Sequence, residues 1–201
     1  MNQDITNQNN KTCIIICNGP SVSHFNQVRE QFDLKNCDII AVNRWTNVFR
    51  QLKLDEYTPS DVIVGKNSLY DNIRNITTMS DTMFHGFNNI RRNNYTKLQF
   101  GVSKCYLNCN DTIYFNMMGS LWWSRIYAIQ LALKRNYSRI HVFGFTCTNE
   151  PDAWDNMRRA NIPKINLNRI QMFFHTMERA GLLSRITFYE NSPHILSKYI
   201  M

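Results

Sequence analysis

The fold is decided by a stretch near the start of the chain, TCIIIC at residues 12–17, which runs directly into Asn18-Gly19-Pro20-Ser21. An unbroken run of β-branched residues and Cys is typical of a strand that is buried on both faces, as in a parallel sheet. The Gly-Pro pair then ends the strand, and a helical stretch follows from Ser23 to Phe32. The chain therefore opens with a strand, a turn and a helix, the first half of a βαβ unit.

The same alternation recurs along the rest of the chain. Further strands are predicted at 38–43, 61–64, 82–87, 139–145 and 186–189, and further helices at 66–80, 121–133, 168–180 and 193–199. Gly181 suits the position just after the helix at 168–180, where a left-handed residue commonly ends a helix. Strands that alternate with helices pair in parallel. We therefore expect an α/β fold, with a flexible tail at 1–11 and a single Rossmann-like domain at 12–201, whose mostly parallel twisted sheet carries helices on both faces.

The composition supports a packed domain and excludes several classes of protein. With 43% hydrophobic and 12% aromatic residues, the chain can bury a sizeable core, which excludes wholesale disorder. No apolar run approaches the ~20 residues of a membrane span, and the polar N-terminus lacks the apolar segment of a secretory signal. We therefore expect a cytoplasmic protein with reduced thiols. Heavy use of Asn, Ile and Lys is typical of an AT-rich genome, viral or bacterial.

The cysteines and the charge bear on partners. Cys13 and Cys17 flank the buried Ile14-Ile15-Ile16 run and are expected to act as small hydrophobic residues, since no His stands near them in zinc-finger spacing. The net charge of +8 suggests a polyanionic partner or simply a solvated basic surface. Because the basic pairs Arg91-Arg92, Lys134-Arg135 and Arg158-Arg159 are dispersed, nucleic acid is not favoured. The oligomeric state, a homo-oligomer included, stays open.

In open α/β sheets, ligands bind beyond the carboxyl ends of the strands, so the residues that follow the strands are the candidate site. Gly119 and Ser120 are added because they open the most hydrophobic helix. The predicted binding residues are Asn18, Gly19, Pro20, Ser21, Asn43, Arg44, Asn67, Gly119, Ser120 and Thr146.

Each group has a binding interpretation and a structural one. Gly19 allows a ligand to approach the backbone closely, and Ser21 would cap a helix whose N–H groups face an anion; the alternative is an ordinary turn. Ser120 would likewise cradle a phosphate or merely cap its helix. Asn43 suits the edge of a base or a sugar hydroxyl and Arg44 suits phosphate, unless Asn43 only forms an Asx turn. Neither a G-x-G-x-x-G nor a Walker motif is present.

Residues 14–22, IIICNGPSV, resemble the opening strand and loop of the bacterial family 42 sialyltransferases, a pattern shared with the MptE-like pterin pyrophosphokinases. Asn43-Arg44 stands where the sialyltransferases have an Asn-Gln pair, and Asn67 where they have an Asn after the third strand. Gly119-Ser120 and the strand RIHVFGF at 139–145 resemble the family's small-residue loop and later strand. The matches run in order over most of residues 12–200.

The resemblance implies a metal-independent glycosyltransferase of the GT-A-variant type, without a cofactor, that transfers a sugar from a CMP-activated or other nucleotide-activated donor to a glycan or another hydroxyl acceptor. It places Asn18, Asn43 and Asn67 on the nucleotide and sugar, and Gly119 and Ser120 near the phosphate or base. The absence of a D-x-D triplet fits a reaction that needs no divalent ion.

The sequence also departs from that family. Residues 161–166 hold no His where the family has its general base, and the strand ends Gly144-Phe145-Thr146 where the family has Gly-Ile-Asp. The base that activates the acceptor must come from elsewhere, and His194 and Asp155 are preferred to His175. Two alternatives stay open: a non-catalytic basic module that binds nucleotides or nucleic acid, and a pterin pyrophosphokinase, which needs ATP and Mg²⁺ with carboxylate ligands.

Overall fold

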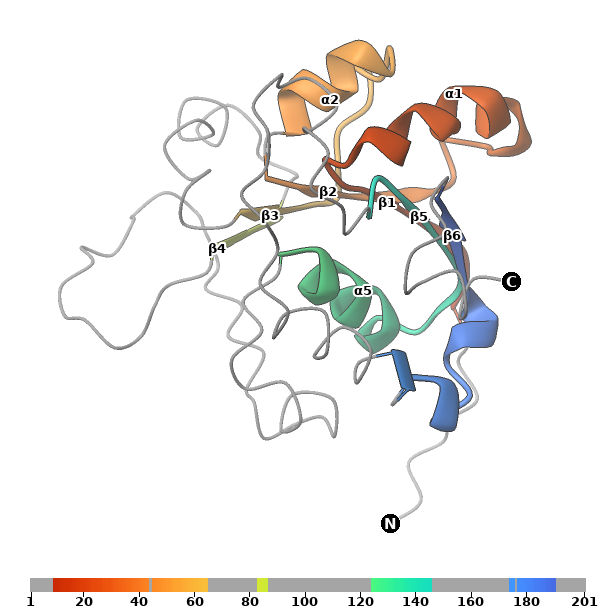
Figure 1. The fold of residues 1–201 in the computed structure, drawn as a ribbon. Coiled ribbons are helices and arrows are strands. Elements are labelled where there is room, and N and C mark those ends of the chain that lie inside the picture. The colour runs from red at the N-terminus through yellow and green to blue at the C-terminus, as the bar shows by residue number, and fades with distance from the viewer. Residues whose placement is uncertain are drawn as a thin grey trace, which may run out of the picture.

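The computed structural model describes residues 9–43, 45–64, 83–86, 124–145, 174–175 and 177–190. These residues contain one six-stranded sheet, in which every neighbouring pair of strands is parallel (Figure 1). The strands are β1 (Asn9–Ile16), β2 (Asp38–Val42), β3 (Asp61–Val64), β4 (Met83–Gly86), β5 (Tyr137–Phe143) and β6 (Ile186–Tyr189).

The strand order is β4-β3-β2-β1-β5-β6. The chain builds the sheet outward from β1 through β2 and β3 to β4, and then returns to place β5 on the other side of β1. The direction of winding therefore reverses between β1 and β5, which is where doubly wound sheets bind their ligands. The predicted Rossmann-like α/β architecture, with parallel strands, is confirmed at this level.

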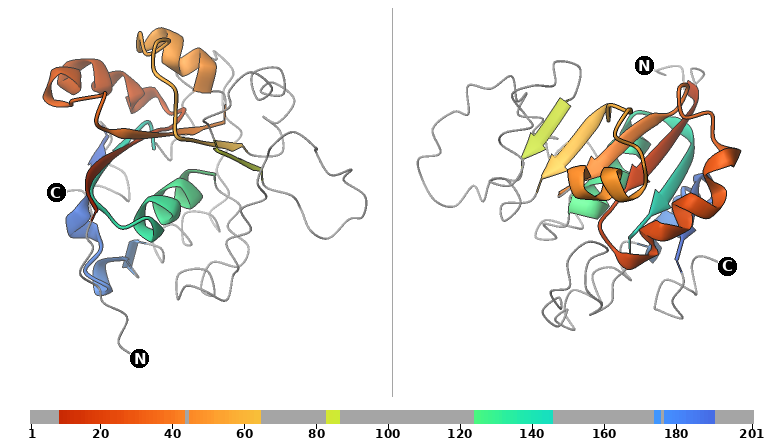
Figure 2. Two further views of the ribbon diagram at one scale, coloured as in Figure 1. Left: turned by 180° about the vertical axis from the view of Figure 1, so that it is seen from behind. Right: turned by 90° about the horizontal axis from the view of Figure 1, so that it is seen from above.

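Helices cover both faces of the sheet (Figures 1 and 2). On one face lie α1 (His24–Val28), flanked by the short 3-10 turns η1 (Pro20–Ser23) and η2 (Arg29–Gln31), and α2 (Trp45–Gln51). On the other face lies α5 (Ser124–Lys134). None of the helices in the described ranges is long and apolar enough to cross a membrane.

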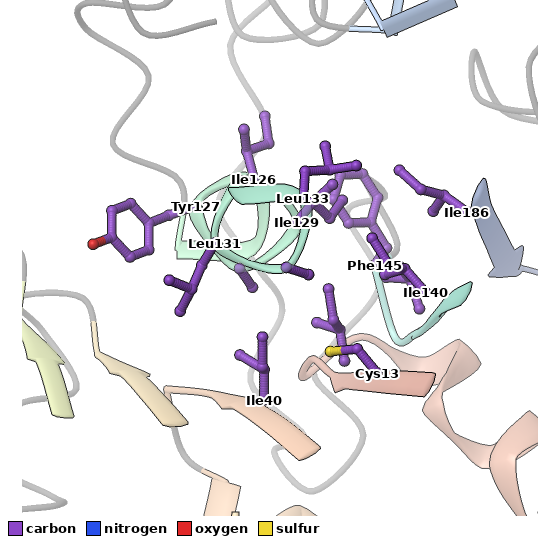
Figure 3. Close-up of a cluster of buried hydrophobic side chains, with 14 of the residues drawn as sticks. Cys13, Ile40, Ile126, Tyr127, Ile129, Leu131, Leu133, Ile140, Phe145 and Ile186 are labelled. Carbon is purple, nitrogen blue, oxygen red and sulfur yellow. The ribbon is translucent and has the colours of Figure 1, made fainter. Parts of the chain in front are cut away.

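Successive side chains of β1 point to opposite faces of the sheet and pack into two separate hydrophobic cores, because helices cover both faces. Ile14 and Ile16 pack with α1 and α2, whereas Cys13, Ile15 and Cys17, the residue just after β1, belong to the cluster around α5. Figure 3 shows Cys13 in this second cluster. All five side chains are fully buried. Burial raises the pKa of the Cys13 thiol, and the nearby charges of Asp38 and Asp61 raise it further. The expectation that Cys13 and Cys17 act as small hydrophobic residues is confirmed.

The element boundaries agree with the sequence for the short strands β3 and β6 and differ elsewhere. β1 begins at Asn9 rather than Thr12, so Asn9 to Lys11 belong to a strand and not to the tail. The helix predicted at 23–32 begins at Pro20 and is divided into η1, α1 and η2. The helix α2 was not predicted.

Gly181 ends its helix as predicted. Its φ is +67°, its N–H donates to the carbonyl of Glu178 at 2.9 Å, and the N–H of Leu182 donates to the carbonyl of Met177 at 2.9 Å. This pair of bonds is the Schellman motif. The predicted helices at 66–80 and 193–199 lie outside the described residues.

Charged side chains are paired at the amino ends of β2 and β3, which we call the amino edge of the sheet. The buried Asp61 carboxylate receives two hydrogen bonds from the Arg135 guanidinium, one of them at 2.7 Å, and a third from the Ser60 hydroxyl at 2.9 Å. Asp38 receives hydrogen bonds of 2.6 Å from both Lys11 and the Tyr137 hydroxyl. At this edge, ion pairs join the start of β2 to Lys11 in β1 and the start of β3 to Arg135 just after α5, and a hydrogen bond joins the start of β2 to Tyr137 at the start of β5.

Candidate functional site

The carboxyl ends of β1 and β5 are joined by two backbone hydrogen bonds. The N–H of Cys17 donates to the carbonyl of Phe143 at 2.9 Å, and the N–H of Gly19 donates to the carbonyl of Gly144 at 2.8 Å. Asn18 lies between these two bonded residues. The loop that follows β1 is therefore fixed to the end of β5 at the point where the sheet reverses its direction of winding.

Gly144 is required at its position by two features of the backbone. Its φ is +69°, in the left-handed region that favours glycine. A Cβ atom added there would lie 2.8 Å from the carbonyl oxygen of Cys17 and 3.0 Å from the nitrogen of Gly19. The β1 and β5 loops approach each other so closely that no side chain fits between them.

Asn18 is buried, with 4% of its surface exposed, and its Oδ1 has no hydrogen-bond partner among the residues that the structure describes. A buried acceptor without a partner costs about 1–3 kcal/mol, so such atoms are rare in native proteins unless something else completes them. Asn18 is a predicted binding residue, and the structure places it at the strand end where a ligand is expected. Its side chain can accept a hydrogen bond from an N–H or O–H group that a ligand brings.

The role predicted for Ser21 as a helix cap is wrong. Gly19 occupies the capping position, with extended backbone, and Pro20 begins the 3-10 turn, so Ser21 lies inside the turn and is buried. Proline fits the first position of a helical turn because that position needs no N–H donor. The following α-helix, α1, has only 5 residues. Gly19 and Pro20 therefore begin this turn at the place predicted for Ser21.

At the end of β2, Asn43 adopts a left-handed backbone with φ of +54°, and its N–H donates to the carbonyl of Ile63 in β3 at 2.7 Å. Trp45 follows as the first residue of α2. Its ring packs edge-on against Phe49, with the centroids 5.1 Å apart. The Trp45 Nε1, on a side chain only 6% exposed, has no hydrogen-bond partner within the described ranges. Asn43 is thus placed at the predicted edge, and Trp45 is a residue there that the sequence pattern did not single out.

Arg125 was also not predicted. It lies in the first turn of α5 and donates from its Nη1 to the carbonyl of Phe145 at 2.8 Å. This bond shows that α5 starts beside the carboxyl end of β5, and it brings a positive charge to within one residue of Gly144. The only sequence signal for Arg125 was its place shortly after Gly119-Ser120 at the start of a predicted helix.

The structure brings Asn18, Gly19, Pro20 and Ser21 together with the end of β5, and it places Asn43 after the neighbouring strand. The remaining predicted site residues lie outside the described residues: Arg44, Asn67, Gly119, Ser120, Thr146, Asp155 and His194.

Two of the described histidines are His141 and His175, the second of which was considered as a base from the sequence. His141 is half-buried in the middle of β5, where its Nδ1 lies 3.1 Å from the Tyr189 hydroxyl. Its ring packs against Phe32 in a T-shaped arrangement, with the ring centroids 4.8 Å apart. Burial lowers its pKa, and the charge of Arg139 lowers it further, so its imidazole is neutral at pH 7. His175 is exposed and lies 3.7 Å from Glu178. Their contacts make His141 a packing residue and His175 a surface residue.

Metal ligands are not grouped in the described part of the chain, where no three His, Cys, Asp or Glu side chains lie close enough together to hold an ion. No family model matches the sequence, and no curated protein matches it either. Function is therefore inferred from the residues at the carboxyl ends of β1 and β5.

Proposed function

We propose that the chain is a metal-independent glycosyltransferase of the GT-A-variant type, which uses a nucleotide-activated sugar, with a CMP-sugar favoured, and a glycan or other hydroxyl acceptor. The observation that carries the proposal is the buried Oδ1 of Asn18, which has no partner among the described residues and follows β1 where a doubly wound sheet binds its ligand. The resemblance of residues 14–22 to the opening loop of family 42 sialyltransferases supports the same position.

The chemistry of Asn18 favours a nucleoside or sugar group over a phosphate as its contact. An acceptor oxygen needs a donor, and ribose hydroxyls, sugar hydroxyls and the exocyclic amine of cytosine all supply one. The phosphodiester of a CMP-sugar has no hydrogen to donate. In the proposed complex, therefore, Asn18 binds the nucleoside or the sugar, and the phosphate lies elsewhere.

Arg125 is the residue proposed to lie near that phosphate. Its guanidinium lies in the first turn of α5 and is held by the carbonyl of Phe145, beside the turn that fixes Asn18. A guanidinium and the positive end of a helix both favour an anion. In the proposed reaction, the acceptor oxygen bonds to the sugar carbon while the bond from that carbon to the phosphate oxygen breaks, and the nucleotide leaves with the electron pair. Positive charge at this point would stabilise the leaving phosphate without a metal.

The acceptor hydroxyl must also lose its proton to a base. Asp155 and His194 stay the candidates proposed for this role on the sequence. His141 is not proposed, because its ring nitrogen is engaged with Tyr189 in the middle of β5.

Titration calorimetry of the full chain with CMP, UDP, GDP and their sugar conjugates tests the proposal. We expect CMP and a CMP-sugar to bind, and release of CMP from the sugar conjugate to depend on an added acceptor. Absence of binding to every compound overturns the proposal. Tight binding of RNA or DNA with a steep salt dependence, without nucleotide-sugar turnover, would replace it with the non-catalytic module, and Mg²⁺-dependent consumption of ATP with a pterin would replace it with the pyrophosphokinase.

A further inference from the structure

Gly144 lies at the end of β5, outside the set of residues proposed to contact the ligand. We infer that Gly144 is the positioning residue of the site: it holds Asn18 in place through the backbone. The inference rests on the proposed function, because Asn18 is the residue that the ligand is proposed to contact.

Asn18 cannot move independently of the end of β5. Its two chain neighbours, Cys17 and Gly19, both donate their N–H groups to β5 and its turn, at 2.9 Å to Phe143 and at 2.8 Å to Gly144. A peptide segment of three residues that is bonded at both ends moves with the strand to which it is bonded. The position of Asn18 therefore depends on the backbone path through Phe143 and Gly144.

Only glycine can adopt the backbone conformation at position 144 without a clash. The φ of +69° turns the Gly144 carbonyl toward Gly19, and L-residues with a side chain avoid that region. An added Cβ would meet the oxygen and carbon of Cys17 at 2.8 and 3.0 Å and the nitrogen of Gly19 at 3.0 Å, whereas carbon contacts are favourable at about 3.5–4.0 Å. All three atoms are backbone atoms on either side of Asn18, so relief requires the Asn18 loop itself to shift.

The chain contains a matched control for this substitution. Gly181 also has a left-handed backbone, with φ of +67°, but a Cβ added there would meet nothing within 4 Å. Alanine at either position is strained by the positive φ, and only at Gly144 does it also clash with the Asn18 loop. A comparison of Gly144→Ala with Gly181→Ala therefore separates positioning of Asn18 from loss of stability.

The test measures amide hydrogen exchange in the ligand-free chain and CMP affinity by calorimetry. In Gly144→Ala we expect faster exchange at Cys17 and Gly19 and an affinity for CMP that is lower by about tenfold or more, since small misplacements of binding groups have effects of that size. In Gly181→Ala we expect unchanged exchange at Cys17 and Gly19 and unchanged affinity. Unfolding midpoints of both variants show whether they are equally destabilised.

A second variant keeps the test possible if Gly144→Ala does not fold. Gly144→Asn keeps a residue that tolerates the left-handed region but still adds a Cβ, so it should show the same losses. Wild-type exchange and affinity in the Gly144 variants overturn the inference. If the wild-type chain binds no nucleotide, the proposed function fails, while exchange at Gly19 still decides whether Gly144 positions the loop. If neither Gly144 variant folds, CMP should slow exchange at Gly19 in the wild-type chain more than at Gly181, and equal effects at both amides overturn the inference.

Discussion

The two ends of the sheet satisfy their polar groups in opposite ways. At the amino edge, Asp61 is bound by Arg135 and Ser60, and Asp38 is bound by Lys11 and Tyr137. At the carboxyl ends of β1 and β2, the buried Asn18 Oδ1 and Trp45 Nε1 have no partner among the described residues. Asp61 is as fully buried as Asn18 and Trp45, so burial alone does not account for the difference between these groups.

The contrast suggests different roles for the two ends of the sheet, one in stability and the other in binding. A buried charge that has lost its partner is strongly destabilising, so the amino edge must be complete in the folded chain. A neutral amide can remain without a partner at a smaller cost and be completed by a ligand. The amino edge therefore stabilises the fold, and the carboxyl ends of β1 and β2 keep hydrogen-bonding capacity that the described residues do not use.

The largest expected effect comes from breaking the amino edge. Arg135→Met removes the guanidinium from the fully buried Asp61 carboxylate, and we expect the free energy of unfolding to fall by about 3–5 kcal/mol. Urea denaturation measures it. The affinity for CMP should be unchanged in the fraction that is folded.

Two controls accompany this variant. Arg139→Met removes an exposed arginine from β5 and should change stability by about 0.5 kcal/mol or less. Replacing both partners, by Asp61→Leu with Arg135→Met, should recover much of the loss because no charge then stays buried. A small loss in Arg135→Met alone would contradict the view that the ion pair stabilises the fold.

A smaller effect, of the opposite kind, is expected at the carboxyl end of β1. Asn18→Ala removes an oxygen that has no partner among the described residues, so the free energy of unfolding should stay the same or rise. The affinity for CMP should fall about tenfold to a hundredfold, which corresponds to about 1.4–2.7 kcal/mol. Thermal unfolding and calorimetry on the same preparation measure both quantities. A loss of stability without a loss of affinity would place Asn18 with the structural residues and remove the contrast between the two edges.

The smallest effect is expected from His141, which lies in the middle of β5, between the amino and carboxyl ends of the strands. Burial lowers the pKa of His141 below its ordinary value of 6.5, so below about pH 6.5 the unfolded chain takes up a proton that the folded chain resists. Stability should therefore fall as the pH drops from about 6.5 toward the lowered pKa, and His141→Gln should remove this part of the pH dependence.

Urea titrations at about pH 7.5 and pH 5.5, on either side of the ordinary histidine pKa, measure the loss. His175→Gln, which removes an exposed imidazole instead, is the control. If His141→Gln loses as much stability as the wild-type chain between these two pH values, the interpretation of His141 is wrong.

The strands were predictable where a short apolar run has clear ends. The runs at 61–64 and 186–189 match β3 and β6 because polar residues or glycine bound them closely. The helix after β1 was predicted as one piece because hydrophobic periodicity does not distinguish 3-10 turns from α-helix. The helix α2 was missed because its buried side chains, Trp45, Val48 and Phe49, fall within only 7 residues, too few to establish a period.

The sequence predicts the site residues that follow each strand, but not the contacts between one strand and another. Asn18 and Asn43 were identified because each follows a buried strand, and the structure places both at that edge. The contact between Gly19 and Gly144 could not be predicted, because it depends on β5 lying beside β1, and strand order is not encoded in local pattern. The burial of the Asn18 oxygen without a partner among the described residues and the left-handed turn at Gly144 also depend on three-dimensional packing, so the sequence does not predict them.

The strand order also determines the order in which the chain can be completed during synthesis. Ile14 in β1 pairs with Ile39, 25 residues later, and with His141, 127 residues later. At translation rates of about 5–20 residues per second, one side of β1 waits roughly 6–25 s for its partner strand. A nascent chain thus exposes an unpaired apolar strand edge of the kind that promotes aggregation. The edge of β1 that faces β5 is therefore exposed for longer during synthesis than the edge that faces β2.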